Sequence, residues 1–323
     1  MAGVTIMQQG NRYTRRTFLK VAAAGGVAWS MPIPIKRSWA ARGSERGALR
    51  FIFYTDPHSR VEWETPQALA MAAESINAQG ADLAVAGGDL ITEGFESTSE
   101  AMAPRWDAYM RMHRALKPEI RPVIGNHDLV GADPDDGSPP SPEPRREYLR
   151  HLGLNRSYYS FDAVGYHFVV LDSIDVRRGD KHRYWGYIDD EQMEWLKEDL
   201  ASLPVEIPIV LATHVPLLTG FFQATEGIQA SAPPNRVIVN NRDVLSLFQG
   251  RNLVLVLQGH LHVDEWLRWR NTSFITGGAI CGRWWRGAWH GTREGYGVVT
   301  LRPDRVEWEY HIYGWEARRP EHA

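Results

Sequence analysis

The chain has 323 residues, 43% of them hydrophobic, and a formal charge of −3 at neutral pH. A chain of this length and apolar content can bury one large core, and an acidic balance argues against a protein that follows long nucleic acids. Its one cysteine, Cys281, excludes an intrachain disulfide, and we interpret it as a small packed side chain rather than a reactive thiol.

The first 40 residues have the features of an export signal. Residues 14–20, TRRTFLK, resemble the twin-arginine motif, residues 21–31 form an apolar stretch, and a small-x-small cleavage signal ends at Ala40. We expect residues 1–40 to be a signal peptide, and residues 41–323 to be exported by the twin-arginine machinery to the periplasm or the extracellular space. The apolar stretch is too short for a stable membrane span. The alternative is a basic N-terminus with a chance apolar run.

This N-terminal segment conceals how acidic the remaining chain is. It carries six of the 36 Lys and Arg residues and none of the 39 Asp and Glu residues, so 30 basic side chains remain against 39 acidic ones, a net charge of −9. We therefore expect no long nucleic acid as a partner, although local Arg residues and metal ions can still attract a small nucleotide.

Apolar runs and amphipathic stretches alternate along the chain. Helices are expected at 65–79, 99–116 and 189–202, and in the first of these Thr65 is the expected N-cap, Pro66 the first helical residue and Gly80 the stop. The expected strands are 49–55, 81–86, 121–124, 207–212 and 252–257. This alternation predicts an α/β fold.

Each of these five strands is followed by a short motif that contains Asp, His or Asn. Sites in α/β sheets lie at the carboxyl ends of the strands, so the motifs converge if the strands are neighbours in one sheet system. Two motifs hold paired residues two positions apart, and extended backbone would direct both side chains of a pair to the same side. The motifs are Asp56-Pro57-His58, Gly87-Gly88-Asp89, Gly125-Asn126-His127-Asp128, Thr213-His214 and Gly259-His260-Leu261-His262.

These side chains form a mixed nitrogen and oxygen ligand set. Imidazoles, carboxylates and an amide oxygen suit two divalent or trivalent ions such as manganese, iron or zinc. Two cations that share a carboxylate can activate the water between them and polarise phosphoryl oxygens. The motifs therefore predict an enzyme that hydrolyses phosphate esters.

In this order, the five motifs resemble the pattern of the calcineurin-like metallophosphoesterase superfamily, D-x-H, G-D, G-N-H-[DE], H and G-H-x-H. The resemblance implies a four-layer αββα sandwich with the site at the ends of the sheets. It implies one metal held by Asp56, His58, Asp89 and His262, and a second held by Asp89, Asn126, His214 and His260, with Asp89 bridging. It also implies that His127 donates a proton to the leaving group and that Asp128 orients His127.

One departure from the family pattern and two further similarities indicate which subfamily the chain resembles. Purple acid phosphatases place a Tyr three residues after the bridging Asp, where this chain has Thr92, and this weakens that interpretation. Residues 158–173 and His214-Val215-Pro216 are similar to class III cyclic-nucleotide phosphodiesterases. We therefore predict a phosphodiesterase that acts on cyclic nucleotides or other small phosphate esters. The alternatives are a phosphomonoesterase, a nucleotide pyrophosphatase, and a catalytically silent metal-binding interaction protein.

Two loops and a C-terminal segment give weaker evidence of function than the five motifs do. Residues 131–144 are expected either to overhang the site or to be a solvated insertion, and the basic residues of 173–187 are interpreted as a surface charge cluster. Residues 277–291 hold three Trp and two Arg, and resemble a Gly-x-Trp-Trp-x-Gly element of some bacterial calcineurin-like phosphoesterases. Their candidate substrate-binding residues are Arg283, Trp284 and Arg286. The alternative, which we favour, is that the tryptophans pack the flanking strands, 295–301 and 305–313, onto the sandwich.

Overall fold

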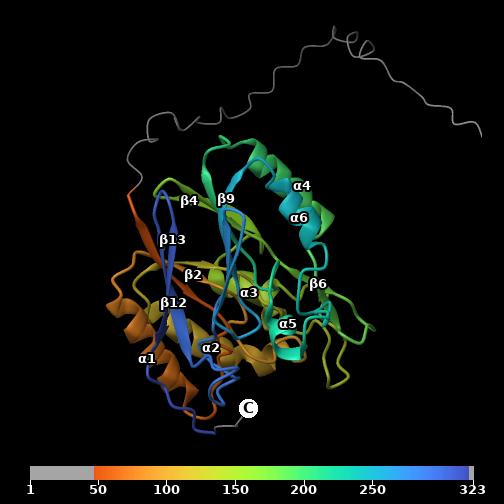
Figure 1. Ribbon diagram of the computed structural model, residues 1–323. Helices are drawn as coiled ribbons and strands as arrows, with labels where there is room; N and C mark the ends of the chain where they lie inside the picture. Colours follow the sequence, from red (N-terminus) through yellow and green to blue (C-terminus); the bar gives the residue numbers. More distant parts are fainter. Residues whose placement is uncertain (1–46, 320–323) are drawn as a thin grey trace, which may run out of the picture. The chain divides into compact units, whose positions relative to one another are not determined.

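Two β-sheets form the centre of the fold (Figure 1). We describe residues 47–319 of a computed structural model, so the predicted signal peptide lies outside the described residues. The first sheet has the order β13 (Val306–Ile312), β12 (Gly295–Leu301), β1 (Leu49–Tyr54), β2 (Leu83–Ala86) and β3 (Glu119–Pro122). The second has the order β10 (Glu265–Trp269), β11 (Thr272–Thr276), β9 (Asn252–Gln258), β8 (Pro208–Ala212), β5 (Tyr166–Val170) and β4 (Tyr159–Ala163).

Alternate side chains of the two sheets meet in an apolar layer. Phe51 and Phe53 of β1 belong to one buried cluster with Phe168 of β5 and Leu255 of β9. The rings of Phe51 and Phe168 pack edge to face with their centroids 5.5 Å apart. The opposite faces of both sheets carry apolar side chains as well, so each sheet is covered by helices.

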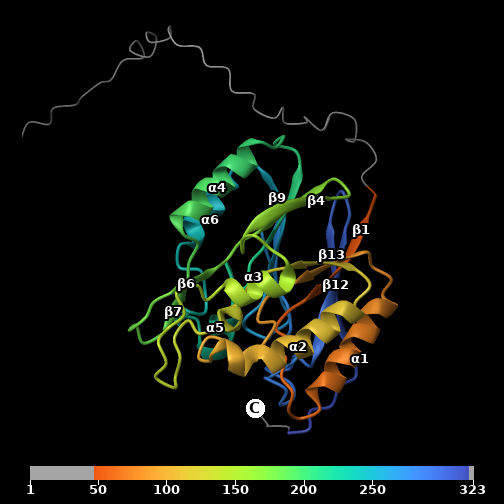
Figure 2. The ribbon, with the colours of Figure 1, turned by 180° about the vertical axis from the view of Figure 1, so that it is seen from behind.

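These helices complete four layers (Figures 1 and 2). Helices α1 (Thr65–Ala78) and α2 (Ser99–Ala115) cover the first sheet, whereas α4 (Asp190–Ala201) and α6 (Asn241–Leu247) cover the second. The predicted αββα sandwich is confirmed. The remaining elements are a 3-10 turn η2 (Asn126–Asp128), helices α3 (Arg146–Leu152) and α5 (Phe221–Glu226), and a hairpin of β6 (Ile174–Val176) and β7 (Tyr184–Gly186).

The predicted helices are present, but the start of the first was wrong. Glu64, in left-handed backbone, precedes α1, and Thr65 is its first residue. The Thr65 hydroxyl donates to the Arg60 carbonyl at 2.8 Å, so this side chain fastens the preceding loop rather than capping the helix. The Asp189 carboxylate does cap α4, because it accepts a hydrogen bond from the Gln192 N–H at 2.8 Å.

The basic segment 173–187, interpreted from the sequence as a surface charge cluster, has a structural role as well. It forms the β6–β7 hairpin, and its arginines bind the loop that follows η2. Arg183 lies 2.7 Å from Asp133 and 3.0 Å from Asp135, and Arg178 donates to the Ala132 carbonyl at 2.9 Å. The hairpin therefore holds this loop in place, through contacts between residues that are about 50 positions apart in sequence.

His167 of β5 makes the stability of the sandwich depend on pH. Its ring nitrogens lie 2.8 Å from Asp162 and 2.9 Å from Asp199, and the side chain is 6% exposed. Burial by itself lowers the pKa of His167, but hydrogen bonds and charge interactions with the two carboxylates outweigh burial and raise the pKa to about 9. The folded state therefore binds this proton more tightly than the unfolded chain does.

We expect His167→Gln to lower the free energy of unfolding by about 2 kcal/mol at pH 6 and by much less at pH 10. A raised pKa in the folded state stabilises the protein fully below the unfolded value near 6.5, and this stabilisation is lost as the pH rises through about 9. Urea unfolding of both proteins at the two pH values measures the difference, in which contributions from other groups cancel. An equal loss at both pH values would mean that packing, not charge, is the cause.

Candidate metal centre

The seven predicted metal ligands converge in the loops that follow β1, β2, β3, β8 and β9. They come from both sheets, and each is at most 4% exposed. They are Asp56, His58, Asp89, Asn126, His214, His260 and His262. The site therefore lies at the carboxyl ends of the parallel strands, as expected for an α/β protein.

Asp89 lies between two groups of side chains. In the first, His262 Nε2 is 3.1 Å from both Asp56 Oδ1 and His58 Nε2, and His58 Nε2 is 3.5 Å from Asp89 Oδ2. In the second, His214 Nε2 is 3.1 Å from both Asp89 Oδ2 and His260 Nδ1. This is the arrangement that two cations with one bridging carboxylate require.

The oxygen atoms that face this centre are suited to bind a pair of cations. Among the described residues, the buried Asp56 Oδ1 and Asn126 Oδ1 accept no hydrogen bond. Buried oxygens without a partner are costly, and two cations at the predicted positions would satisfy one oxygen each. The structure therefore supports the predicted grouping of ligands, while the coordination itself stays a prediction.

Hydrogen bonds orient the ligands toward the centre. His214 Nδ1 donates to the Gly87 carbonyl at 2.8 Å and His262 Nδ1 donates to the Gly282 carbonyl at 2.7 Å, so each Nε2 is left to bind a cation. His260 Nε2 donates to the Asn235 carbonyl at 2.9 Å and leaves Nδ1 for the same purpose. The tautomer of each ring follows from these carbonyl acceptors.

The two carboxylates are held in a similar way. Asp56 Oδ2 accepts from the Thr55 hydroxyl at 2.6 Å and from the His260 N–H at 3.0 Å. Asp89 Oδ1 accepts from the His127 N–H at 2.8 Å. In each case the protein binds one oxygen and directs the other at the imidazoles.

The backbone conformation of the candidate ligands differs from the one that we predicted from their spacing. We expected extended backbone, but five of the seven ligands have left-handed backbone, with φ of 51° at Asp56, 38° at His58, 52° at Asp89, 72° at His260 and 58° at His262. Each left-handed turn folds the chain back at the end of a strand. Such conformations cost roughly 1–3 kcal/mol each and are concentrated at functional sites.

The close approach of the backbone to the two carboxylates also explains why two positions in the motifs are glycine. A Cβ atom at Gly125 would overlap the Asp89 carboxylate, and one at Gly259 would lie 2.8 Å from Asp56 Oδ2. Neither glycine has a positive φ, so the absence of a side chain is what these positions require.

The carboxylates and imidazoles shift one another's pKa values. Burial raises the pKa of Asp56 and of Asp89, but the neighbouring histidines outweigh burial and bring both pKa values below the ordinary range. Conversely, burial lowers the pKa of His214, but the charges of Asp89 and Asp56 raise it to about 9. Because a metal-bound imidazole is unprotonated at the ligating nitrogen, cations would bind here with release of protons.

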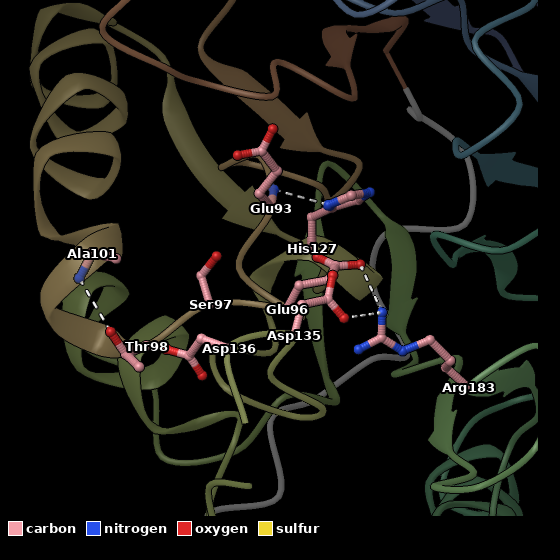
Figure 3. A pocket seen from close by; sticks show the side chains of 9 residues that line it. All are labelled: Glu93, Glu96, Ser97, Thr98, Ala101, His127, Asp135, Asp136 and Arg183. Carbon is pink, nitrogen blue, oxygen red and sulfur yellow. Dashed lines mark hydrogen bonds and ion pairs between the residues drawn. The ribbon is translucent and has the colours of Figure 1, made fainter. Parts of the chain in front are cut away.

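His127 lies at the edge of the centre, with its ring centroid 4.8 Å from that of His58. The Glu93 N–H donates to His127 Nδ1 at 3.0 Å (Figure 3), so the proton of the neutral ring is on Nε2. Burial lowers the pKa of His127. The neutral ring therefore presents an Nε2–H at the edge of the centre, and its role as a proton donor stays a prediction.

Asp128 does not orient His127 as we expected. Its carboxylate accepts the backbone N–H groups of Leu90 at 2.8 Å and Gly125 at 2.9 Å, and so braces the loops after β2 and β3. Burial and the charge of Asp89 raise the pKa of Asp128 to about 8. The Glu93 N–H takes the orienting role, and no side-chain motif could have predicted a backbone donor.

The tryptophans of the C-terminal segment divide between packing and the site. Trp285 is 1% exposed, and its Nε1 donates to the His58 carbonyl at 2.9 Å, so the packing interpretation holds for this residue. The Trp284 ring, in contrast, has its centroid 4.7 Å from that of His262. Arg286 lines a cavity beside His58, whereas Arg283 lies over the Trp289 ring at 5.0 Å.

Sequence reasoning missed two residues at this cavity. Arg60 and Trp63, from the loop between β1 and α1, line it together with Trp284 and Arg286. Both follow the first motif closely, but neither matches the family pattern. Proximity to Asp56-Pro57-His58 was the only available signal.

The family model of calcineurin-like phosphoesterases matches residues 49–264. The chain belongs to this family. It is therefore a metal-dependent phosphoester hydrolase, and family membership together with the Asp and His clusters implies a dinuclear metal site.

Relatives of this calcineurin-like phosphoesterase include purple acid phosphatase 23 of Arabidopsis thaliana, which is 26% identical over 178 residues. The match covers 51% of this chain and 33% of that protein, so the chain spans about a third of the relative's length.

Solved structures share the fold. A dimetal phosphatase from Danio rerio has a TM-score of 0.57 at 15% identity, covering 82% of this chain and 96% of the other. Purple acid phosphatase PPD1 from yellow lupin has a TM-score of 0.52 at 14% identity, covering 83% and 52%. GAP50, the anchor in the inner membrane complex of Plasmodium, has a TM-score of 0.53 at 15% identity, covering 82% and 85%. Within residues 47–319, no helix has the length and apolar character to span a membrane.

Proposed function

We propose that this calcineurin-like phosphoesterase hydrolyses phosphodiesters of small molecules. The supporting observation is that two cavities open beside the candidate metal centre. One, of about 560 Å³, is lined by His127 (Figure 3), and the other, of about 330 Å³, is lined by His58. Glu93 borders both cavities. A phosphodiester carries two substituents on phosphorus, and each cavity offers a place for one of them.

The ligands, His127 and Glu93 have different roles in the proposed reaction. The seven ligands would hold two cations, which supply an activated water and neutralise phosphoryl oxygens when bound. His127 Nε2–H would face the leaving oxygen and donate to it a hydrogen bond from the neutral ring or a proton from the doubly protonated ring, while the Glu93 N–H keeps the neutral ring in this orientation. The leaving group occupies the cavity beside His127, and the retained group occupies the cavity beside His58.

Similarity to class III cyclic-nucleotide phosphodiesterases supports the same reaction type. Thr92, at the position of the purple acid phosphatase tyrosine, is buried and lines the smaller cavity. We therefore place the chain with the diesterases rather than with the purple acid phosphatases, although the relative in Arabidopsis thaliana bears that name.

A substrate panel tests this proposal. We expect protein loaded with manganese, iron or zinc to hydrolyse bis(p-nitrophenyl) phosphate with a kcat/KM at least about tenfold above that for p-nitrophenyl phosphate, since only the diester fills both cavities. The reverse preference would favour a phosphomonoesterase, and release of AMP from ATP as the main activity would favour a nucleotide pyrophosphatase. No turnover with any of these metals would contradict the enzymatic function and favour a catalytically silent metal-binding interaction protein.

We also infer that residues 41–323 form the exported phosphoesterase domain, carried by the twin-arginine route to the periplasm or beyond the cell. The support is the sequence of residues 14–20 and the cleavage signal that ends at Ala40. We expect Arg15→Lys with Arg16→Lys to leave a precursor in the cytoplasm in cell fractionation. Unchanged processing would contradict the inference.

A further inference from the structure

We propose that the cavity beside His58 is a specificity pocket that receives the retained group of the diester and selects a planar aromatic group, such as a nucleoside, over a cationic one. This rests on the proposed diesterase function and names the substrate class of the same site. We call this cavity, lined by His58, Arg60, Trp63, Thr92, Glu93, Trp284, Trp285 and Arg286, the tryptophan pocket.

Two indoles form the aromatic walls of the tryptophan pocket. The Trp284 ring centroid is 4.7 Å from His262 and 6.2 Å from His58, so this wall begins at the candidate metal ligands. Trp63 comes from the loop between β1 and α1, and both indoles are only partly buried. A group attached to metal-bound phosphate would therefore meet indole surface at once, and such surface stacks on any base.

Arginines around the pocket make it unsuitable for a cation. The guanidinium groups of Arg60, Arg286 and Arg319 lie 4.2, 5.0 and 5.4 Å from the Trp63 ring centroid. Guanidinium groups therefore already lie over the Trp63 ring, and a base would stack on Trp284 and on these planar guanidinium groups. Arg60 is paired with Glu62 at 3.5 Å and with Glu93 at 3.2 Å, so position rather than net charge disfavours an amine or a quaternary ammonium group: guanidinium groups already occupy the places over Trp63 that such a cation would take.

The backbone of the tryptophan pocket indicates a built site rather than a gap between loops. Trp63, Trp284 and Trp285 have φ of 56°, 46° and 69°, and His58 and Glu93 are left-handed too. This conformation is unfavourable for bulky side chains and persists only where surrounding contacts enforce it. At His58 one such contact is the hydrogen bond that the indole N–H of the buried Trp285 donates to the His58 carbonyl.

The larger cavity, beside His127, is more acidic than the tryptophan pocket, although Glu93 borders both. Glu93, Glu96, Asp135 and Asp136 line it, with Arg183 as its basic residue (Figure 3). A diester with one aromatic and one neutral or cationic substituent is therefore oriented by charge, with the aromatic substituent in the tryptophan pocket and the other beside the proton donor.

Three diesters with the same leaving group isolate the tryptophan pocket. The p-nitrophenyl ester of thymidine 5′-monophosphate, bis(p-nitrophenyl) phosphate and p-nitrophenyl phosphorylcholine differ only in the retained group. We expect the first two to exceed the third in kcat/KM by at least about tenfold. Trp63→Ala and Trp284→Ala should each lower kcat/KM for the thymidine ester by roughly tenfold, mainly through KM, and should change the choline ester by less than about twofold.

Trp269→Ala is the matched control, because Trp269 is 63% exposed on β10. Metal content and the thermal unfolding midpoint of each variant show whether the centre and the fold are intact. A preference for the choline ester, or equal losses for all three diesters in both variants, would overturn the proposal.

Binding separates this proposal from the proposed reaction. If no diester is turned over, the diesterase function fails, but titration calorimetry of metal-loaded protein with thymidine 5′-monophosphate and with phosphorylcholine still tests the pocket. We expect the nucleotide to bind at least about tenfold more tightly, with most of that difference lost in Trp63→Ala. Equal affinities in the unaltered protein would overturn the pocket assignment, even if the variants fail to fold.

Discussion

Asp89→Ala is expected to abolish hydrolysis and bound metal together. The Asp89 Oδ2 atom is 3.1 Å from His214 Nε2 and 3.5 Å from His58 Nε2, so its removal takes one oxygen from both proposed metal positions. Loss of this bridge should lower kcat/KM by roughly 10³-fold or more, since paired cations supply several kcal/mol of transition-state stabilisation. The measurement is the metal content of the purified protein, together with turnover of bis(p-nitrophenyl) phosphate.

The control for this prediction is an exposed aspartate that lies outside the candidate metal centre. Asp304, in the turn between β12 and β13, has a side chain that is 71% exposed, and Asp304→Ala should keep both metal and activity. Excess manganese or zinc in the assay distinguishes weaker binding from complete loss of the site. An Asp89 variant that retained two ions per chain and normal turnover would refute the bridging role.

His127→Gln is expected to separate chemistry from metal binding. Its Nε2 lies outside the proposed ligand set and its Nδ1 accepts the Glu93 N–H, so the substitution should leave metal content unchanged. Loss of a general acid should lower kcat by about 10²–10⁴-fold for a substrate with a poor leaving group. For a p-nitrophenyl ester the loss should be much smaller, because p-nitrophenolate departs without a proton.

The dependence on the leaving group decides between two roles of His127. A series of aryl and alkyl diesters, assayed on both proteins, should give a loss of kcat that grows as the leaving group becomes more basic. A uniform loss across the series would mean that His127 binds phosphate rather than donating a proton. His290→Gln, at an exposed histidine that matches no motif, is the control for the substitution itself.

Much of the fold and of the candidate centre follows from the amino-acid sequence by itself. Strand periodicity is local, and so are the motifs Asp56-Pro57-His58 and Gly259-His260-Leu261-His262 that end two of the strands. Because parallel strands bring their carboxyl ends to one edge, convergence of these motifs follows from chain order and elementary geometry. The grouping around Asp89 agrees with the distances between its side chain and the neighbouring histidines.

Only the tertiary structure decided the features that depend on contacts between distant segments. The left-handed backbone at His58 is held in part by Trp285, 227 positions later, and the orientation of His127 depends on the backbone of Glu93. The residues next to His58 and His127 in the sequence do not indicate these distant partners. For the same reason Arg60 and Trp63, ordinary loop residues in the sequence, became the walls of a pocket only when the chain folded and brought Trp284 and Arg286 beside them.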